Sequence, residues 1–175
     1  MPMYTVEHSY PLTAEQKNQL AEALTKIHTE KFTVPRFFVN INIKDISSEW
    51  TYGAGMRNKA NRISGQIRWG PSRTDEMLYE IIEEIHAAWA SIVGTKGDQG
   101  LRAVFIHGSI VASAEKGFLS PKAGADVGYL KKNYAAFKQR ADEGDKEFQS
   151  LMKEVENREA FRGVVDEAAV FNRTS

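Results

Sequence analysis

Residues 37–43 read FFVNINI, a run in which apolar and polar side chains alternate. Alternate side chains of an extended chain point to opposite faces, so this pattern is typical of a half-buried β-strand. The face expected toward the core carries Phe37, Val39, Ile41 and Ile43, and the other face carries Phe38, Asn40 and Asn42. The elements on either side of this strand decide the fold class.

A strand and a helix are predicted ahead of it. Residues 3–8 are typical of a short strand. Thr13, followed three residues later by Gln16, matches a capping box at a helix N-terminus. Leu20, Leu24 and Ile27 then recur at helical spacing, and the helix is expected to run to about residue 31. The three elements together form one βαβ unit.

The same order recurs further along the chain. A strand-like stretch ends near residues 67–69, a turn follows at 70–72, and a helix is expected from about residue 74 to 93. Its apolar stripe consists of Leu78, Ile81, Ile82, Ile85 and Trp89. Residues 101–107 (LRAVFIH) form the last clear strand.

Two βαβ units predict an α/β (α+β) fold in which a four-stranded sheet carries two helices on one face, over residues 1–128. The order βαββαβ also describes a ferredoxin-like fold, with an antiparallel sheet and an amino terminus remote from Arg68. Residues 129–175 are heavily charged, with a helical stripe of Phe148, Leu151, Met152 and Val155, which Phe161, Val164, Val165 and Ala168 extend. We expect a C-terminal helical extension that packs on the domain or on a neighbouring subunit.

Composition narrows the function classes. The chain of 175 residues has 23 basic and 23 acidic side chains and no net charge, which argues against nucleic-acid binding. It contains no cysteine, no histidine pair at metal-ligand spacing and no apolar run of membrane-spanning length. The turn at residues 70–72 lacks the glycines of a phosphate-binding loop. We therefore expect a cytoplasmic protein that has no metal, cofactor, membrane or nucleic-acid partner.

An acid-free block spans residues 50–74, and it contains Arg57, Lys59, Arg62, Arg68 and Arg73. Arg68 and Arg73 flank the turn before the second helix, where free backbone N–H groups favour an anion. Guanidinium groups bind carboxylates through two parallel hydrogen bonds, so this pair is a candidate clamp for a small carboxylate substrate. The alternative is that both side chains reach solvent or pair with Asp75 and Glu76.

Two further residues are candidates for chemistry. His28 lies in register with Leu20 and Leu24, on the core side of the first helix, where a histidine is either a hydrogen-bonded core residue or a catalyst. Pro2 follows Met1, and methionine before a small residue is normally trimmed. An amino-terminal proline is a secondary amine. Burial and nearby cations disfavour its charged form and so bring its pKa toward neutrality.

Together these features resemble the tautomerase superfamily, and within it the cis-3-chloroacrylic acid dehalogenase group. The resemblance covers roughly residues 2–135 and includes Leu12-Thr13, His28, FFVNINI, and Glu115-Lys-Gly117 with Pro121 and Gly124. It implies catalytic roles for Pro2, His28, Arg68, Arg73 and Glu115, and a homotrimer that the C-terminal tail locks. Under this resemblance Tyr4, Asn40 and Trp69 line the substrate pocket.

Two departures from that group bear on the reaction. Its arginines stand three apart, whereas Arg68 and Arg73 are five apart, and Val104 stands where its dehalogenases carry a tyrosine on the last strand. Dehalogenation and hydration are therefore in question, while proton transfer by proline is not. Our first hypothesis is a cofactor-free tautomerase acting on a small 2-keto or enol carboxylate. The alternatives are a hydratase, dehalogenase or decarboxylase of three-carbon unsaturated acids, and a non-catalytic binding protein.

Overall fold

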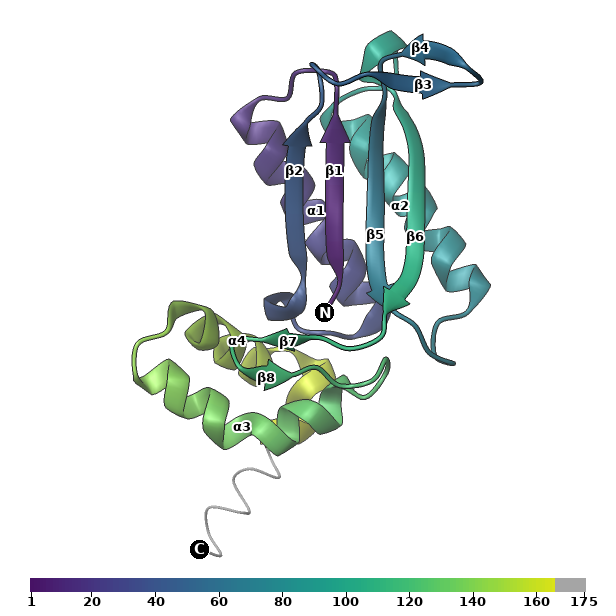
Figure 1. Cartoon of the computed structure of the whole chain (residues 1–175). Helices are drawn as coiled ribbons and strands as arrows, with labels where there is room; N and C mark the ends of the chain where they lie inside the picture. Colours follow the sequence, from purple (N-terminus) through teal and green to yellow (C-terminus); the bar gives the residue numbers. More distant parts are fainter. Residues whose placement is uncertain (166–175) are drawn as a thin grey trace, which may run out of the picture.

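The structure is a computed structural model in which residues 1–165 are described. Its main sheet has the strand order β2-β1-β5-β6 (Figure 1). The strands are β1 (Met3–His8), β2 (Asn40–Asp45), β5 (Asn61–Arg68) and β6 (Leu101–Ile110). β1 pairs with β2 in parallel, β5 pairs with β6 in parallel, and β1 and β5 join the two pairs antiparallel. This mixed sheet confirms the two βαβ units and rules out the ferredoxin-like alternative.

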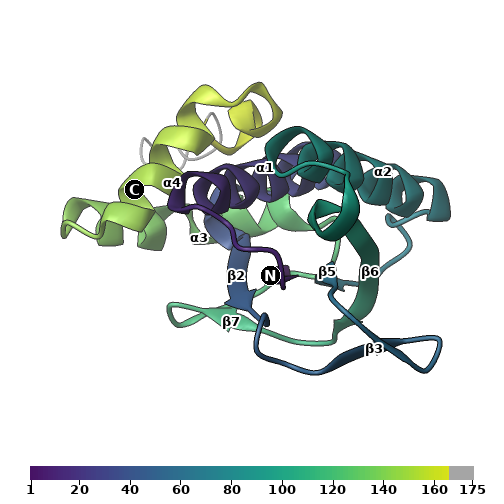
Figure 2. The same cartoon turned by 90° about the horizontal axis from the view of Figure 1, so that it is seen from above.

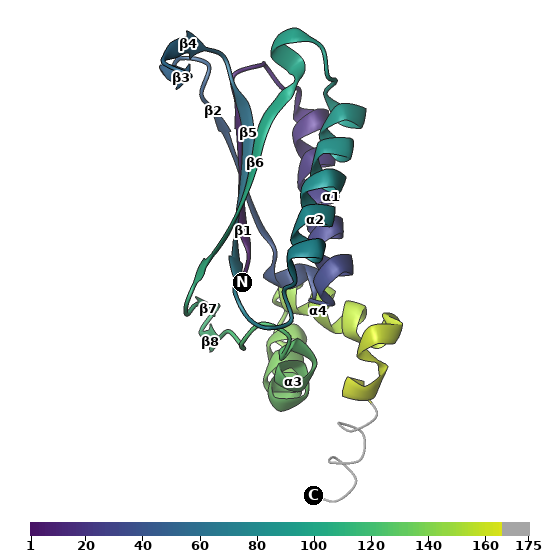
Figure 3. The same cartoon turned by 90° about the vertical axis from the view of Figure 1, so that its right-hand side faces the viewer.

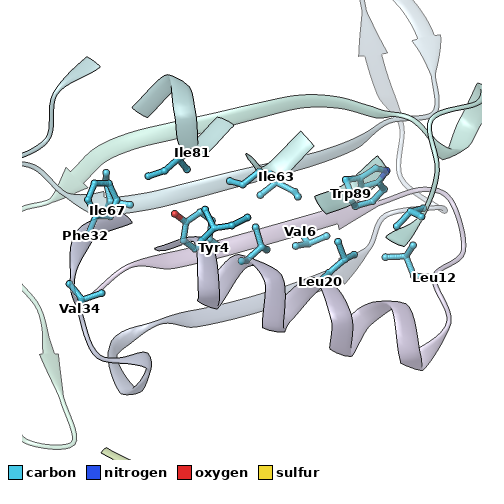
Figure 4. Close-up of a cluster of buried hydrophobic side chains, with 14 residues drawn as sticks. Tyr4, Val6, Leu12, Leu20, Phe32, Val34, Ile63, Ile67, Ile81 and Trp89 are labelled. Atoms are coloured by element: carbon cyan, nitrogen blue, oxygen red, sulfur yellow. The ribbon is translucent and has the colours of Figure 1, made fainter. Parts of the chain in front are cut away.

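Two long helices, α1 (Ala14–Phe32) and α2 (Asp75–Ile92), lie side by side on one face of the sheet (Figures 2 and 3). The predicted capping box is present, since Thr13 Oγ1 accepts from the Gln16 amide and the Gln16 side chain accepts from the Thr13 amide. Thr74 is the N-cap residue of α2, and its Oγ1 accepts from the backbone amide of Met77. Tyr4, Val6, Leu20, Ile81 and Trp89 are among the buried side chains that fill the space between helices and sheet (Figure 4).

The strand predicted over residues 37–43 begins later than expected. Arg36–Phe38 form a short 3-10 helix, in which the amide of Phe38 bonds to the carbonyl of Pro35 over 3.1 Å. Val39, Ile41 and Ile43 do pack on the main core, but Phe37 and Phe38 belong to a second apolar cluster beyond the end of the sheet. Phe37 therefore does not share a face with Val39, as the alternation suggested.

Short elements connect the larger ones. The glycine-containing segment between β2 and β5 forms a hairpin, β3 (Thr51–Gly53) and β4 (Met56–Asn58), and its turn residues Ala54 and Gly55 both have positive φ. Gly97–Gln99 form a 3-10 turn before β6. A small hairpin, β7 (Ala114–Glu115) and β8 (Phe118–Leu119), follows β6 at the opposite end of the sheet from β3 and β4 (Figure 1).

The C-terminal part, residues 114–165, contains that hairpin and the helices α3 (Asp126–Asp142) and α4 (Lys146–Asn157), followed by the 3-10 turn Glu159–Phe161. The predicted stripe is buried, and Phe161 and Val164 join it; Ala168 lies outside the described residues. α3 begins ahead of residue 129, where the extension was expected to start, and the division into two domains stays a prediction.

Polar contacts join this C-terminal part to the end of α1. The Arg158 guanidinium donates to the carbonyls of Thr29 (2.7 Å) and Val34 (2.9 Å), and Glu154 accepts from the Arg36 amide at 2.9 Å. The extension thus packs on the same chain, as one of the two sequence-based alternatives predicted. It lies below the end of the sheet at which β1 begins (Figures 1 and 3).

Candidate active site

A pocket of about 710 Å³ lies where β1 begins and β6 ends. Its lining comprises Met1, Pro2, Met3, Asn40, Gln66 and the run from Ser109 to Glu115. The backbone N–H of Asn40 donates to the Pro2 carbonyl over 3.1 Å, which holds Pro2 beside the first residue of β2. Pro2 is therefore fixed at a pocket wall by backbone pairing at the end of the sheet where β1 begins.

Met1 precedes Pro2 and is itself buried in this structure. Its side chain is only 6% exposed and packs in the apolar cluster of the C-terminal part, while its amine donates to Ser113 Oγ at 3.2 Å. Burial, followed by the positive charge of Arg68, lowers the pKa of this amine from 8.0 to about 6. Arg73 acts in the same direction, whereas Asp126 and Glu115 oppose the shift. The amino terminus thus occupies surroundings that favour a neutral amine.

Arg68 ends β5 and is 6% exposed. Its guanidinium forms a 2.7 Å ion pair with Asp126 Oδ1 and donates to the carbonyls of Pro121 (2.7 Å) and Lys122 (3.2 Å). Asp126 is itself only 2% exposed. The sequence-based alternative, in which Arg68 pairs with Asp75 or Glu76, is wrong. Arg68 pairs with Asp126, the first residue of α3.

Arg73 is 5% exposed and, within residues 1–165, its guanidinium forms neither a hydrogen bond nor an ion pair. The guanidinium carbon lies 3.4 Å from the centre of the Phe32 ring, and the Nε atom is buried without a partner. Burial, followed by the charge of Arg68, lowers the pKa of Arg73 from 12.5 to about 10. Arg73 remains cationic at neutral pH, so it is a buried positive charge with no carboxylate bound to it.

His28 and Tyr4 form a hydrogen-bonded pair on the helix-facing side of β1, with 3.0 Å between Nδ1 and the phenol oxygen. Both residues are 1% exposed (Tyr4 is labelled in Figure 4). Burial, then the charges of Arg73, Arg68 and the amino terminus, hold the pKa of His28 well below its usual 6.5. Burial also raises the pKa of Tyr4. The histidine is therefore neutral and presents a hydrogen-bonding group rather than a charge.

The remaining predicted residues lie in three different places. Glu115 and Asn40 line the pocket together, and the side-chain Nδ2 of Asn40 donates to Glu115 Oε2 at 3.3 Å. Trp69 is 55% exposed and packs against Gly108, outside the lining of this pocket. Val104 packs on the main core and does not line the pocket either.

The predicted residues thus fall into two groups. Pro2, Asn40 and Glu115 line the pocket, whereas Arg68, Arg73, His28 and Tyr4 are buried and are not part of its lining. The Met1 amine is within electrostatic range of both groups, because Arg68, Arg73 and Glu115 all shift its pKa. Asp126 was missed by the sequence analysis, since nothing local distinguishes it from the other acidic residues.

Comparison with known proteins shows the family. Residues 1–133 match the family model described as "Putative oxalocrotonate tautomerase enzyme". The chain belongs to the tautomerase superfamily. No curated protein sequence matches it significantly.

Solved structures share the fold at low sequence identity. A member of the cis-3-chloroacrylic acid dehalogenase family called N1 is 19% identical, with a TM-score of 0.65 over 81% of this chain and 99% of its own. MIF2 of Leishmania major is 18% identical, with a TM-score of 0.55 over 69% and 97% of the two chains. A fused 4-OT called Q0, solved as a symmetric trimer, is 15% identical, with a TM-score of 0.55 over 72% and 98%. The fold of this tautomerase-superfamily chain is therefore that of its relatives, with added C-terminal helices.

Neither a metal site nor a membrane span is found among the residues that the structure describes. No group of three or more His, Cys, Asp or Glu side chains in residues 1–165 is placed to hold a metal ion. Across the same range, the helices are too short or too polar to cross a bilayer.

We predict that the His28 ring stays neutral at pH 5.5, where an imidazole with the usual pKa of 6.5 is mostly charged. Because the unfolded chain binds this proton and the folded chain does not, the free energy of unfolding falls as the pH drops below 6.5. Nuclear magnetic resonance of the ring nitrogens, compared with free histidine in the same buffer, measures the protonation. A His28 titration centred near 6.5 would contradict the burial argument.

Proposed function

We propose that the protein is a cofactor-free, tautomerase-type enzyme in which Pro2, exposed as the amino terminus, is the general base. The substrate is a small 2-keto or enol carboxylate bound in the arginine site, with its carboxylate on Arg73. The observation that carries this proposal is the location of the amino terminus. It lies at a pocket wall, in surroundings where burial and two buried arginines lower the pKa of an amine.

Removal of Met1 is the step on which this function depends. With Met1 in place, the Pro2 nitrogen is part of a peptide bond and has no basicity. The Met1 side chain also lines the pocket and packs in the apolar cluster of the C-terminal part, while the charges of Arg68 and Arg73 reach its amine. Its loss exposes the secondary amine of Pro2 and removes a side chain from the pocket wall in one step.

The proposed reaction is a proton transfer that needs no co-reactant. The neutral Pro2 nitrogen takes a proton from the carbon next to the carbonyl of the keto form, or from the hydroxyl of the enol form, which leaves an enolate, and the resulting ammonium returns the proton to the other of these two atoms. Arg73 stabilises the carboxylate and the developing negative charge in a buried site, where such interactions are strong. Neutral His28 orients the substrate by hydrogen bonding, and Glu115 with Asn40 lies at the pocket rim, where a water molecule would enter.

The expected assembly is a homotrimer. Within residues 1–165, the sheet face opposite α1 and α2 is covered by no helix (Figure 3), and Met3 and Phe105 are 41% and 48% exposed. Solved 4-OT relatives with this fold are trimers. We predict a mass of about three times 19.7 kDa by light scattering. An active monomer at the same concentration would overturn the assembly proposal and leave the site intact.

Pro2→Ala is predicted to lower kcat/KM for ketonisation of an enol carboxylate by about a hundredfold or more, as expected for loss of a general base. The rate is followed by the ultraviolet absorbance of the enol, and intact-mass spectrometry shows whether Met1 has been removed. Pro11→Ala changes an exposed proline ahead of α1 and is the matched control. Wild-type rates in Pro2→Ala, or a wild-type chain that retains Met1 and is active, would reject proline catalysis and favour a binding protein or another base.

The pH profile gives an independent test. A general base must be neutral, so kcat/KM should rise as the amine loses its proton and become constant at higher pH. Since the pocket lowers the pKa of an amine there, the plateau should begin well below pH 8.0, the usual pKa of an amino terminus. A rate that falls over the same range would identify a cationic general acid, as the hydratase or dehalogenase alternative requires.

A further inference from the structure

The ion pair between Arg68 and Asp126 changes which cation is available to a ligand. Asp126 is brought in by α3, from 58 residues further along the chain. Arg68 also binds two carbonyl groups directly ahead of that helix, those of Pro121 and Lys122. Both ends of the Arg68 guanidinium are thus occupied by the protein itself.

The buried side chains of Arg68, Arg73 and Asp126 together carry one net positive charge. Arg68 and Arg73 are both cationic and both buried, and Asp126 compensates one of them. Glu115 is the other acid near the amine, but it lies at the pocket lining and its carboxylate accepts from Asn40. A buried, unpaired cation is costly, and a bound anion of charge −1 removes that cost.

We propose that Asp126 is an internal carboxylate that occupies Arg68, so that Arg73 alone binds the substrate carboxylate and the site selects monocarboxylates over dicarboxylates. This inference deepens the proposed function and rests on its assignment of Arg73 to the substrate carboxylate. Asp126 is a positioning and specificity-determining residue in this account, because it acts through Arg68 and does not touch the substrate.

The contacts of Asp126 are consistent with a role beyond holding α3. Only one of its oxygens bonds to Arg68; the other, Oδ2, is buried and has no hydrogen-bond partner in the part of the chain that the structure describes. A second carboxylate brought by a ligand would lie near this anion and would find Arg68 already paired, so repulsion and the missing hydrogen bonds both disfavour it. The rejection of a dicarboxylate therefore follows from charge and from occupied donors.

The first test uses the unmodified full chain and inert four-carbon acids. Butanoate and succinate have the same carbon skeleton length and differ in one carboxylate, so their dissociation constants, measured at equal ionic strength by ligand-detected nuclear magnetic resonance, isolate that group. We expect butanoate to bind at least about tenfold more tightly than succinate, the size of effect of one charge-assisted hydrogen-bonded pair. Equal binding, or tighter binding of succinate, would overturn the proposal.

The second test is Asp126→Asn, which keeps the side-chain shape and one acceptor oxygen and removes the charge. Succinate affinity should rise about tenfold while butanoate affinity changes less than about threefold, because the anion that repels a second carboxylate is removed and the charge of Arg68 is no longer compensated. Asp145→Asn is the control: it makes the same charge change at the start of α4, where Asp145 pairs with Lys116, and should leave the ratio unchanged. A folded Asp126→Asn protein with the wild-type ratio would show that Asp126 only anchors α3.

These binding measurements separate this inference from the proposed function. If Pro2→Ala has no effect on turnover but the succinate-to-butanoate ratio responds to Asp126→Asn, the carboxylate site stands and proline catalysis fails. If Pro2→Ala abolishes turnover and the ratio does not respond, the enzyme stands and the role given to Asp126 fails. Arg73→Gln should weaken butanoate binding about tenfold or more, and unchanged binding there would overturn the assignment of Arg73.

Discussion

A buried ion pair between Arg68 and Asp126 joins the end of β5 to the start of α3. Both side chains are almost completely buried, so neither can lose its partner without leaving a charge in a water-poor interior, at a cost of about 3–5 kcal/mol. This requirement holds the C-terminal part against the end of the sheet where the chain begins. Met1, which lines the pocket, packs in the apolar cluster of that C-terminal part.

The same constraint shapes the electrostatics of the amino terminus. Two guanidinium groups close to a partly buried amine favour its neutral form, which is the form that a base needs. If Asp126 did not pair with Arg68, the site would hold two uncompensated arginines. With the pair formed, the surplus is one charge, at Arg73, and a single carboxylate balances it. Neutral His28 adds a hydrogen-bonding group without adding another positive charge.

Local sequence patterns predicted much of the fold because the interactions behind them are local. The capping box of Thr13 and Gln16 and the buried stripe of α2 lie within a few turns of helix, and both are present. The strand predicted at residues 37–43 begins three residues later than the pattern indicates, at Asn40. Phe37 packs with Phe148, and Phe38 packs with Tyr129. These partner rings lie about 90 to 110 positions later in the chain, so the alternation of residues within 37–43 contains no information about them.

Sequence alone determined the two βαβ units, the inward position of His28 and the presence of Arg68 and Arg73 at the turn before α2, because each follows from spacing along one element. Of the five cations in residues 50–74, Arg68 and Arg73 are the two that are buried. Only the tertiary structure decided that Asp126 pairs with Arg68, and that Arg73 packs on Phe32 with no carboxylate partner among residues 1–165. The reason is physical: an ion pair depends on distance in space, and the folding of α3 against the sheet sets that distance across 58 residues of chain.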